Sequence, residues 1–108
     1  SAMDGSPRFV ALDNKEVDVI DAFATDGMLM KYHLKVLKDE DHVFPPYYAV
    51  PCFNSDTLKK YPELQRVVDE LAPKLTDEVM MKLNYQVDVQ GKEPKDVARA
   101  FLEQENLI

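Results

Sequence analysis

The sequence contains little of what several common classes of protein depend on. Cys52 is the only cysteine among 108 residues, so it has no cysteine partner for an internal disulfide and none for a cysteine-based zinc site. There is no tryptophan, and there are only three glycines. No apolar run approaches the roughly 20 residues that a membrane-spanning helix needs. The formal net charge is -7, so the basic surface that neutralises phosphates is missing, and we predict no nucleic-acid partner.

Motifs typical of enzymes are missing as well. There is no glycine-rich phosphate loop, no nucleophile elbow and no His-Glu-x-x-His zinc motif. His33 and His42 have no helical spacing, and His42 lies among acidic residues, which favours a solvent-exposed turn. On a strand, Asp18 and Asp21 would face opposite sides, which weakens any paired-acid mechanism. We therefore predict that the chain is not an enzyme and holds no metal or other cofactor.

The first half of the sequence has the pattern of short β-strands. Residues 8–12 are interpreted as the last turns of a helix. β-Branched and alternating apolar residues then predict three strands, over residues 17–23, 34–39 and 48–53. Residues 28–32, between the first two strands, are predicted to form a helical turn or two.

The second half is predicted to be mainly helical. Ser55 can cap a helix over residues 56–60, and Pro62 can open a second one that Pro73 ends. Thr76 can cap a third helix. This helix is expected over residues 77–83. Residues 85–89 alternate between apolar and polar side chains and are predicted to be extended. Pro94 is predicted to open a last helix.

Each predicted helix carries one apolar stripe, and together the stripes need a larger sheet than three short strands supply. We therefore predict an α/β fold, with short strands followed by about four helices, in a chain that is one piece of a larger body. Residues 1–6 have the composition of an expression-tag remnant.

The segment Phe44-Pro45-Pro46-Tyr47 combines aromatic rings with stiff backbone. Two prolines fix their own φ, so the segment should be extended and should hold Tyr47 in one place. Tyr47 is then either a ligand contact or a buried ring at the start of a core strand. Phe23 ends the first predicted strand, and Tyr48 lies beside Tyr47. Aromatic faces attract a desolvated quaternary ammonium group by about 2 kcal/mol or more.

Asp26 precedes Gly27, a residue that can take backbone angles forbidden to others. Asp26 is accordingly either a turn or helix-cap residue, or a residue near a ligand.

Several longer stretches, in order and in register, resemble one known family. The sequence is similar to the substrate-binding domains of osmoprotectant ABC importers, the quaternary amine family that captures glycine betaine, carnitine, choline or similar compounds. The similarity extends from Arg8 to Ile108. The matching stretches are residues 17–27, 44–47, 57–64, 74–78, 83–85, 87–89, 91–92, 97–98 and 101–102.

The resemblance implies a two-lobed, periplasmic-binding-protein-like (type II) fold, of which residues 7–108 would be the C-terminal portion. It also implies an aromatic cage for the ligand cation. Tyr47 and Phe23 fall on cage positions, and Asp26 and Tyr48 are further ligand-binding candidates. The family often has tyrosine where this chain has Phe23, so the loss of a hydroxyl bears on ligand preference rather than on ring packing.

The resemblance further implies a solute-binding component that delivers its ligand to an ABC permease subunit or a fused permease domain. The protein would then act at the extracellular face of the membrane or in the periplasm, and would meet the membrane only through the permease or an anchor. With part of the cage missing, this chain alone is expected to bind such ligands weakly or not at all. Its exposed stripes predict self-association. The alternative is a stand-alone protein-interaction domain that uses its apolar helix faces.

Overall fold

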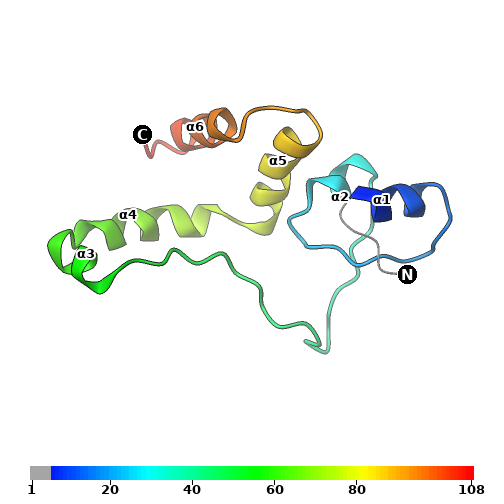
Figure 1. The fold of residues 1–108 in the computed structure, drawn as a ribbon, viewed down its shortest axis with the longest axis horizontal. Helices are drawn as coiled ribbons and strands as arrows, with labels where there is room; N and C mark the ends of the chain where they lie inside the picture. The colour runs from blue at the N-terminus through cyan, green and yellow to red at the C-terminus, as the bar shows by residue number, and fades with distance from the viewer. Residues whose placement is uncertain (1–5) are drawn as a thin grey trace. The chain divides into compact units, whose positions relative to one another are not determined.

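The computed structural model describes residues 6–108, which are helical wherever they have regular structure (Figure 1). The predicted tag remnant lies outside the described residues except for Ser6, which begins the first helix. No helix of the described part is long and apolar enough to cross a membrane. The elements in chain order are α1 (Ser6–Asp13), α2 (Gly27–Lys31), α3 (Ser55–Lys60), α4 (Glu63–Leu71), the 3-10 helix η1 (Ala72–Lys74), α5 (Asp77–Asp88) and α6 (Pro94–Gln104).

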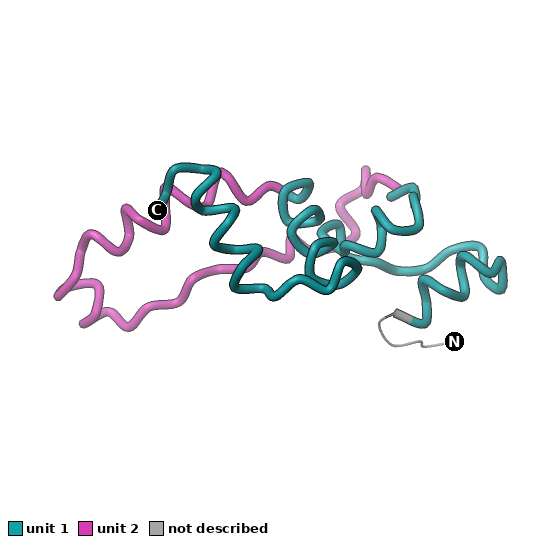
Figure 2. Tube along the Cα trace, turned by 90° about the horizontal axis from the view of Figure 1, so that it is seen from above, with its two compact units in different colours: residues 1–36, 77–108 teal, residues 37–76 magenta. Residues whose placement is uncertain are grey.

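These elements belong to two compact units, coloured separately in Figure 2. Unit 1 is discontinuous in sequence, because it combines the chain up to Val36 with Asp77–Ile108. It therefore contains α1, α2, α5 and α6. Unit 2 is the intervening segment Leu37–Thr76, with α3, α4 and η1.

The buried apolar side chains of the described residues all lie in unit 1. They come from α1, α2 and α6 and are Phe9, Ala11, Leu29 and Val97. Phe9 is only 2% exposed, and its ring stacks on Tyr32 with centroids 6.4 Å apart. Helix α2 packs on α5, and α5 packs on α6. Unit 1 thus has a small core of its own.

Gly27, the first residue of α2, explains how closely α2 approaches α5. A Cβ atom at this position would lie 2.5 Å from the backbone nitrogen of Tyr85 and 2.8 Å from the carbonyl carbon of Asn84. Both distances are far shorter than any real carbon contact, and both atoms belong to the helix backbone. The packing of these two helices therefore requires glycine at residue 27.

Unit 2 has no comparable core. None of residues 37–76 is buried, and the apolar stripe of α4 is at most half-buried, at Leu64, Val68 and Leu71. A long segment without regular structure, residues 37–54, precedes α3 (Figure 1). Most of the large apolar side chains of this segment are exposed.

The β-strands of the predicted α/β fold are absent from residues 6–108. The segments predicted as strands, residues 17–23, 34–39 and 48–53, contain no ladder pairing with one another or with any other described segment. β-Branched, alternating residues favour a pleated and half-buried surface, but a strand forms only where a neighbour exchanges backbone hydrogen bonds with it. The sequence pattern therefore indicated which residues favour a strand, but not whether a second strand lies beside them to pair with.

The helix predictions are confirmed in number and order, with two corrections to their bounds. Asn54, not Ser55, is the N-cap of α3, because its side-chain oxygen accepts a hydrogen bond from the N–H of Asp56 at 2.8 Å. Helix α5 continues to Asp88, although residues 85–89 were predicted to be extended. Its packing on α2 explains this difference, since tertiary contacts routinely outweigh the modest strand preference of alternating residues.

Candidate functional site

Phe23 lies on a tight turn, residues 23–26, that immediately precedes α2. The N–H of Asp26 donates to the carbonyl oxygen of Phe23 at 3.0 Å. In the opposite direction, the N–H of Phe23 donates to Oδ2 of Asp26 at 3.1 Å. The turn is therefore closed by two hydrogen bonds between its own ends, while the side chain of Phe23 stays 56% exposed.

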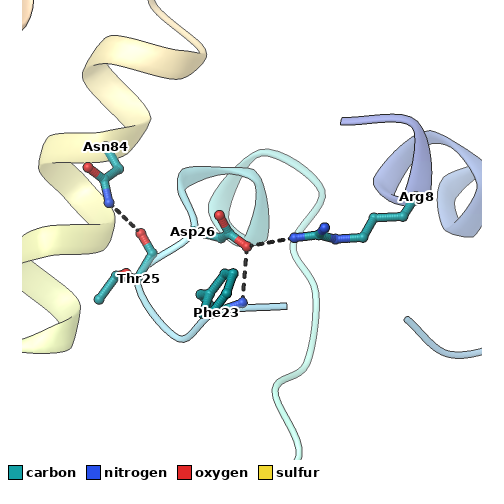
Figure 3. A network of polar contacts seen from close by, with 5 residues as sticks. All are labelled: Arg8, Phe23, Thr25, Asp26 and Asn84. Carbon is teal, nitrogen blue, oxygen red and sulfur yellow. Dashed lines mark hydrogen bonds and ion pairs between the residues drawn. The ribbon is translucent and has the colours of Figure 1, made fainter. Parts of the chain in front are cut away.

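Arg8 of α1 contacts this turn from a distant point in the sequence. Its Nη2 lies 3.4 Å from Oδ2 of Asp26, the same oxygen that accepts from Phe23 (Figure 3). The Arg8 side chain is only 14% exposed, and its guanidinium carbon lies 5.1 Å from the centre of the Phe9 ring. Its Nε is buried with no hydrogen-bond partner in the part of the chain that the structure describes. The Asp26 carboxylate is thus the polar anchor of this guanidinium.

Asn84 of α5 contacts the turn at a second point. Its Nδ2 donates to the carbonyl oxygen of Thr25 at 2.8 Å, in a contact that is partly buried. Figure 3 shows the turn between the side chains of Asn84 and Arg8. Since Gly27 brings α2 against the backbone of the same helix, the turn and α5 are held together at adjacent points.

Tyr47 belongs to unit 2 and follows a second turn that an aspartate closes. Oδ1 of Asp39 accepts from the N–H of Val43 at 3.0 Å, and Oδ2 accepts from the N–H of Phe44 at 2.9 Å. His42, inside this turn, takes a positive φ of 51°, and its side chain is exposed as predicted. The two prolines then continue the chain to Tyr47, which is 87% exposed.

Of the predicted ligand-binding residues, the structure brings Phe23 and Asp26 into direct contact in unit 1. Tyr47 and Tyr48 are neighbours in unit 2, and both rings are exposed. In this chain the Tyr47 ring is exposed rather than buried. Asp26 occupies the N-cap position of α2 but makes no side-chain cap bond there, because its carboxylate points to Phe23 and Arg8.

Sequence reasoning missed three residues that organise these turns: Arg8, Asp39 and Asn84. Asp39 left a weak signal, since aspartate often binds nearby backbone N–H groups at turns. Arg8 and Asn84 left none, because they reach the turn from 18 and 59 residues away. Within residues 6–108, no group of three or more histidine, cysteine, aspartate or glutamate side chains could hold a metal ion.

The class of protein follows from comparison with known sequences. Residues 1–104 match the family described as the substrate-binding domain of ABC-type glycine betaine transport systems. The chain belongs to this family. The family's described role is binding rather than catalysis, which agrees with the predictions of a solute-binding protein and of no enzymatic activity.

The chain is similar to several curated proteins of this kind. It is 43% identical over 98 residues to the carnitine transport binding protein OpuCC of Listeria monocytogenes, covering 91% of this chain and 32% of that protein. It is 41% identical over 101 residues to the ergothioneine transport permease/ergothioneine binding protein EgtU of Helicobacter pylori, covering 94% of this chain and 18% of that protein. It is 34% identical over 106 residues to the glycine-betaine-binding protein of Pseudomonas aeruginosa, covering 98% of this chain and 34% of that protein.

A solved structure agrees with these sequence comparisons. The chain superimposes on the crystal structure of a glycine betaine/carnitine/choline ABC transporter with a TM-score of 0.86 and 38% sequence identity. This superposition covers 93% of the chain and 36% of that structure. The chain therefore spans about a third of the length of the first curated relative and of this structure.

Proposed function

We propose that this chain is part of the solute-binding component of an ABC importer that captures a quaternary ammonium osmolyte. The ligand would be glycine betaine, carnitine, choline or a similar compound. One observation carries this proposal: the family of glycine betaine substrate-binding domains matches almost the whole chain, residues 1–104. The proposal concerns the longer protein, because the chain spans about a third of the first curated relative.

The names of the relatives support a shared ligand chemistry. Carnitine, ergothioneine and glycine betaine differ in size and in their polar groups, and each carries a trimethylammonium group. That group has a positive charge and no N–H donor, so hydrogen-bond acceptors cannot recognise it specifically. Aromatic faces can, because the ring quadrupole attracts the cation without a hydrogen bond.

Tyr47 and Phe23 are the residues that we propose to supply one ring each to an aromatic cage. Two features support this assignment. Both side chains are largely exposed in this chain. Phe23 stands on a turn whose backbone N–H donates to an aspartate side chain, and Tyr47 follows such a turn across two prolines. This limits the freedom that each ring would lose on binding. Tyr48 is the further aromatic candidate beside Tyr47.

The proposed partners follow from the same family. The ligand would pass to an ABC permease, either a separate subunit or a permease domain fused to the binding domain. The Helicobacter pylori relative, whose name combines a permease with a binding protein, supports the fused arrangement as one option. The protein would act on the extracellular face of the membrane or in the periplasm. In this proposal, residues 7–108 form the C-terminal portion of a two-lobed type II binding fold.

Replacing Tyr47 with alanine in the longer binding protein tests the function. Tyr47→Ala should lower the affinity for glycine betaine, carnitine or choline by about 30-fold or more, because a desolvated cation–ring contact contributes about 2 kcal/mol. Isothermal titration calorimetry with each of the three amines measures the change.

Tyr47→Phe is the matched variant, since it keeps the ring face and removes only the hydroxyl. It should retain most of the affinity. If Tyr47→Ala binds the amines as tightly as the unchanged protein, Tyr47 is not part of the ligand site. The 108-residue chain, titrated in parallel, should bind weakly or not at all, and micromolar binding by it would contradict the idea that the cage extends beyond this chain.

A further inference from the structure

The turn that carries Phe23 is held by more interactions than its own closure needs. Two hydrogen bonds already join Phe23 and Asp26. In addition, Arg8 of α1 contacts the Asp26 carboxylate, and Asn84 of α5 binds the carbonyl of Thr25 (Figure 3). Two helices that are distant in sequence therefore fix a turn of four residues, and the exposed side chain on that turn is a ring.

The Asp26 carboxylate is poorly suited to be the counter-charge of a bound cation. Its Oδ2 accepts from the backbone N–H of Phe23 and lies 3.4 Å from the Arg8 guanidinium. Because Arg8 carries one positive charge and Asp26 one negative charge, the pair has no net charge to offer a quaternary ammonium group. Without Asp26, the largely buried Arg8 would be a cation that has lost its carboxylate partner.

We propose that Arg8, Asp26 and Asn84 are positioning residues for Phe23. They fix the turn on which the ring is presented, and Asp26 neutralises Arg8 instead of pairing with the ligand cation. This inference rests on the proposed function, in which Phe23 contacts a quaternary ammonium group. In this inference, Asp26 supports ligand binding by positioning Phe23 and does not itself contact the ligand.

The turn geometry can be tested without any ligand, by hydrogen exchange of the Phe23 amide measured by NMR on the 108-residue chain. Asp26→Ala removes the acceptor and should speed this exchange about fivefold. Asp26→Asn keeps an oxygen for the Phe23 N–H and should leave the rate nearly unchanged. Asp21→Ala, which removes a carboxylate from an exposed position in the same segment, is the control and should have no effect.

The amides of α5 and α6 report in the same spectra whether each variant keeps its fold. If α5 and α6 remain protected and the Phe23 amide exchanges at the same rate in Asp26→Ala as in the unchanged chain, the proposed positioning is overturned. Asn84→Ala provides a second readout. It should speed exchange at Phe23 while the hydrogen bond from the Phe23 N–H to Asp26 is still present, since it frees the turn from α5.

The ligand part of the inference is tested in the longer binding protein by calorimetry with glycine betaine. Asp26→Ala should weaken binding about three- to tenfold, the cost of ordering a ring that is no longer held. The double variant Arg8→Met with Asp26→Asn removes both charges, keeps the apolar stem of residue 8 and keeps the acceptor for Phe23. It should bind nearly as tightly as the unchanged protein.

A direct counter-charge predicts the opposite result for the double variant, which would then lose as much affinity as Asp26→Ala. That result overturns the inference and leaves the proposed function intact. If the unchanged protein binds none of the amines, the proposed function itself fails, and with it the ligand part of the inference. The exchange experiment still decides whether Asp26 holds the turn.

Discussion

Gly27 is the residue at which the absence of a side chain matters most for this fold. Its backbone lies so close to Tyr85 and Asn84 of α5 that no Cβ fits. The same contact region includes the hydrogen bond from Asn84 to Thr25, two residues before the glycine. One small residue therefore allows both the packing of α2 on α5 and the anchoring of the turn that carries Phe23.

Gly27→Ala should destabilise unit 1 by about 1–3 kcal/mol, the usual cost of forcing an extra carbon into a packed contact. The helix propensity that alanine gains over glycine, at most about 1 kcal/mol, does not offset a clash with backbone atoms. Urea unfolding followed by circular dichroism measures the difference.

Gly91 supplies the control for this substitution. No atom lies within 4 Å of a Cβ placed there, and its φ of +70° is one that asparagine tolerates. Gly91→Asn should therefore lower the free energy of unfolding by less than Gly27→Ala does, because it adds backbone strain at that φ but no clash. Equal stability of Gly27→Ala and the unchanged chain would show that α2 can move away from α5 without loss.

Helices are the elements that the sequence predicted well in this chain. Apolar stripes, prolines near helix starts and capping residues placed α3, α4, α6 and the start of α5, whereas α5 continues to Asp88, past its predicted end at residue 83. Strands were predicted wrongly, because their residues report only a preference for a pleated surface and pairing depends on a second segment. The same distinction applies to the site: Phe23 and Tyr47 were recognisable in the sequence, whereas Arg8 and Asn84 act over distances that no local pattern records.

The N-cap of α3 can be tested directly, because the sequence pattern predicted Ser55 and the structure has Asn54. Asn54→Ala removes the oxygen that accepts from Asp56 and should destabilise α3 by about 0.5–2 kcal/mol. Ser55→Ala should leave the helix intact, because Ser55 is its first helical residue. NMR chemical shifts of the α3 Cα atoms distinguish the two variants, and a loss of helix in Ser55→Ala alone would show that Ser55 is the cap.

At the scale of the whole molecule, the exposed apolar surface of unit 2 is the main feature to explain. No residue between Leu37 and Thr76 is buried, and Val67 on α4 is 53% exposed. Large exposed apolar patches usually mark an interface. In the longer protein that we propose, other parts of the binding domain would cover it.

The 108-residue chain should consequently self-associate, with an average mass that rises with concentration in light scattering. Val67→Glu places a charge on the exposed part of the α4 stripe and should reduce the association. Gln65→Glu adds the same charge to an exposed position of the same helix and should have a smaller effect. A single monomeric species at all concentrations would contradict this prediction.

The two aspartate-closed turns differ in when they can be fully anchored along a growing or refolding chain. Asp39 binds N–H groups four and five residues ahead, so its turn can close within microseconds of the segment becoming free. The anchor of the Phe23 turn on α5 spans 59 residues, and it must wait until the chain has reached Asn84. During synthesis, both turns can therefore close early, and the anchoring of the Phe23 turn on α5 follows only after Asn84 has been made.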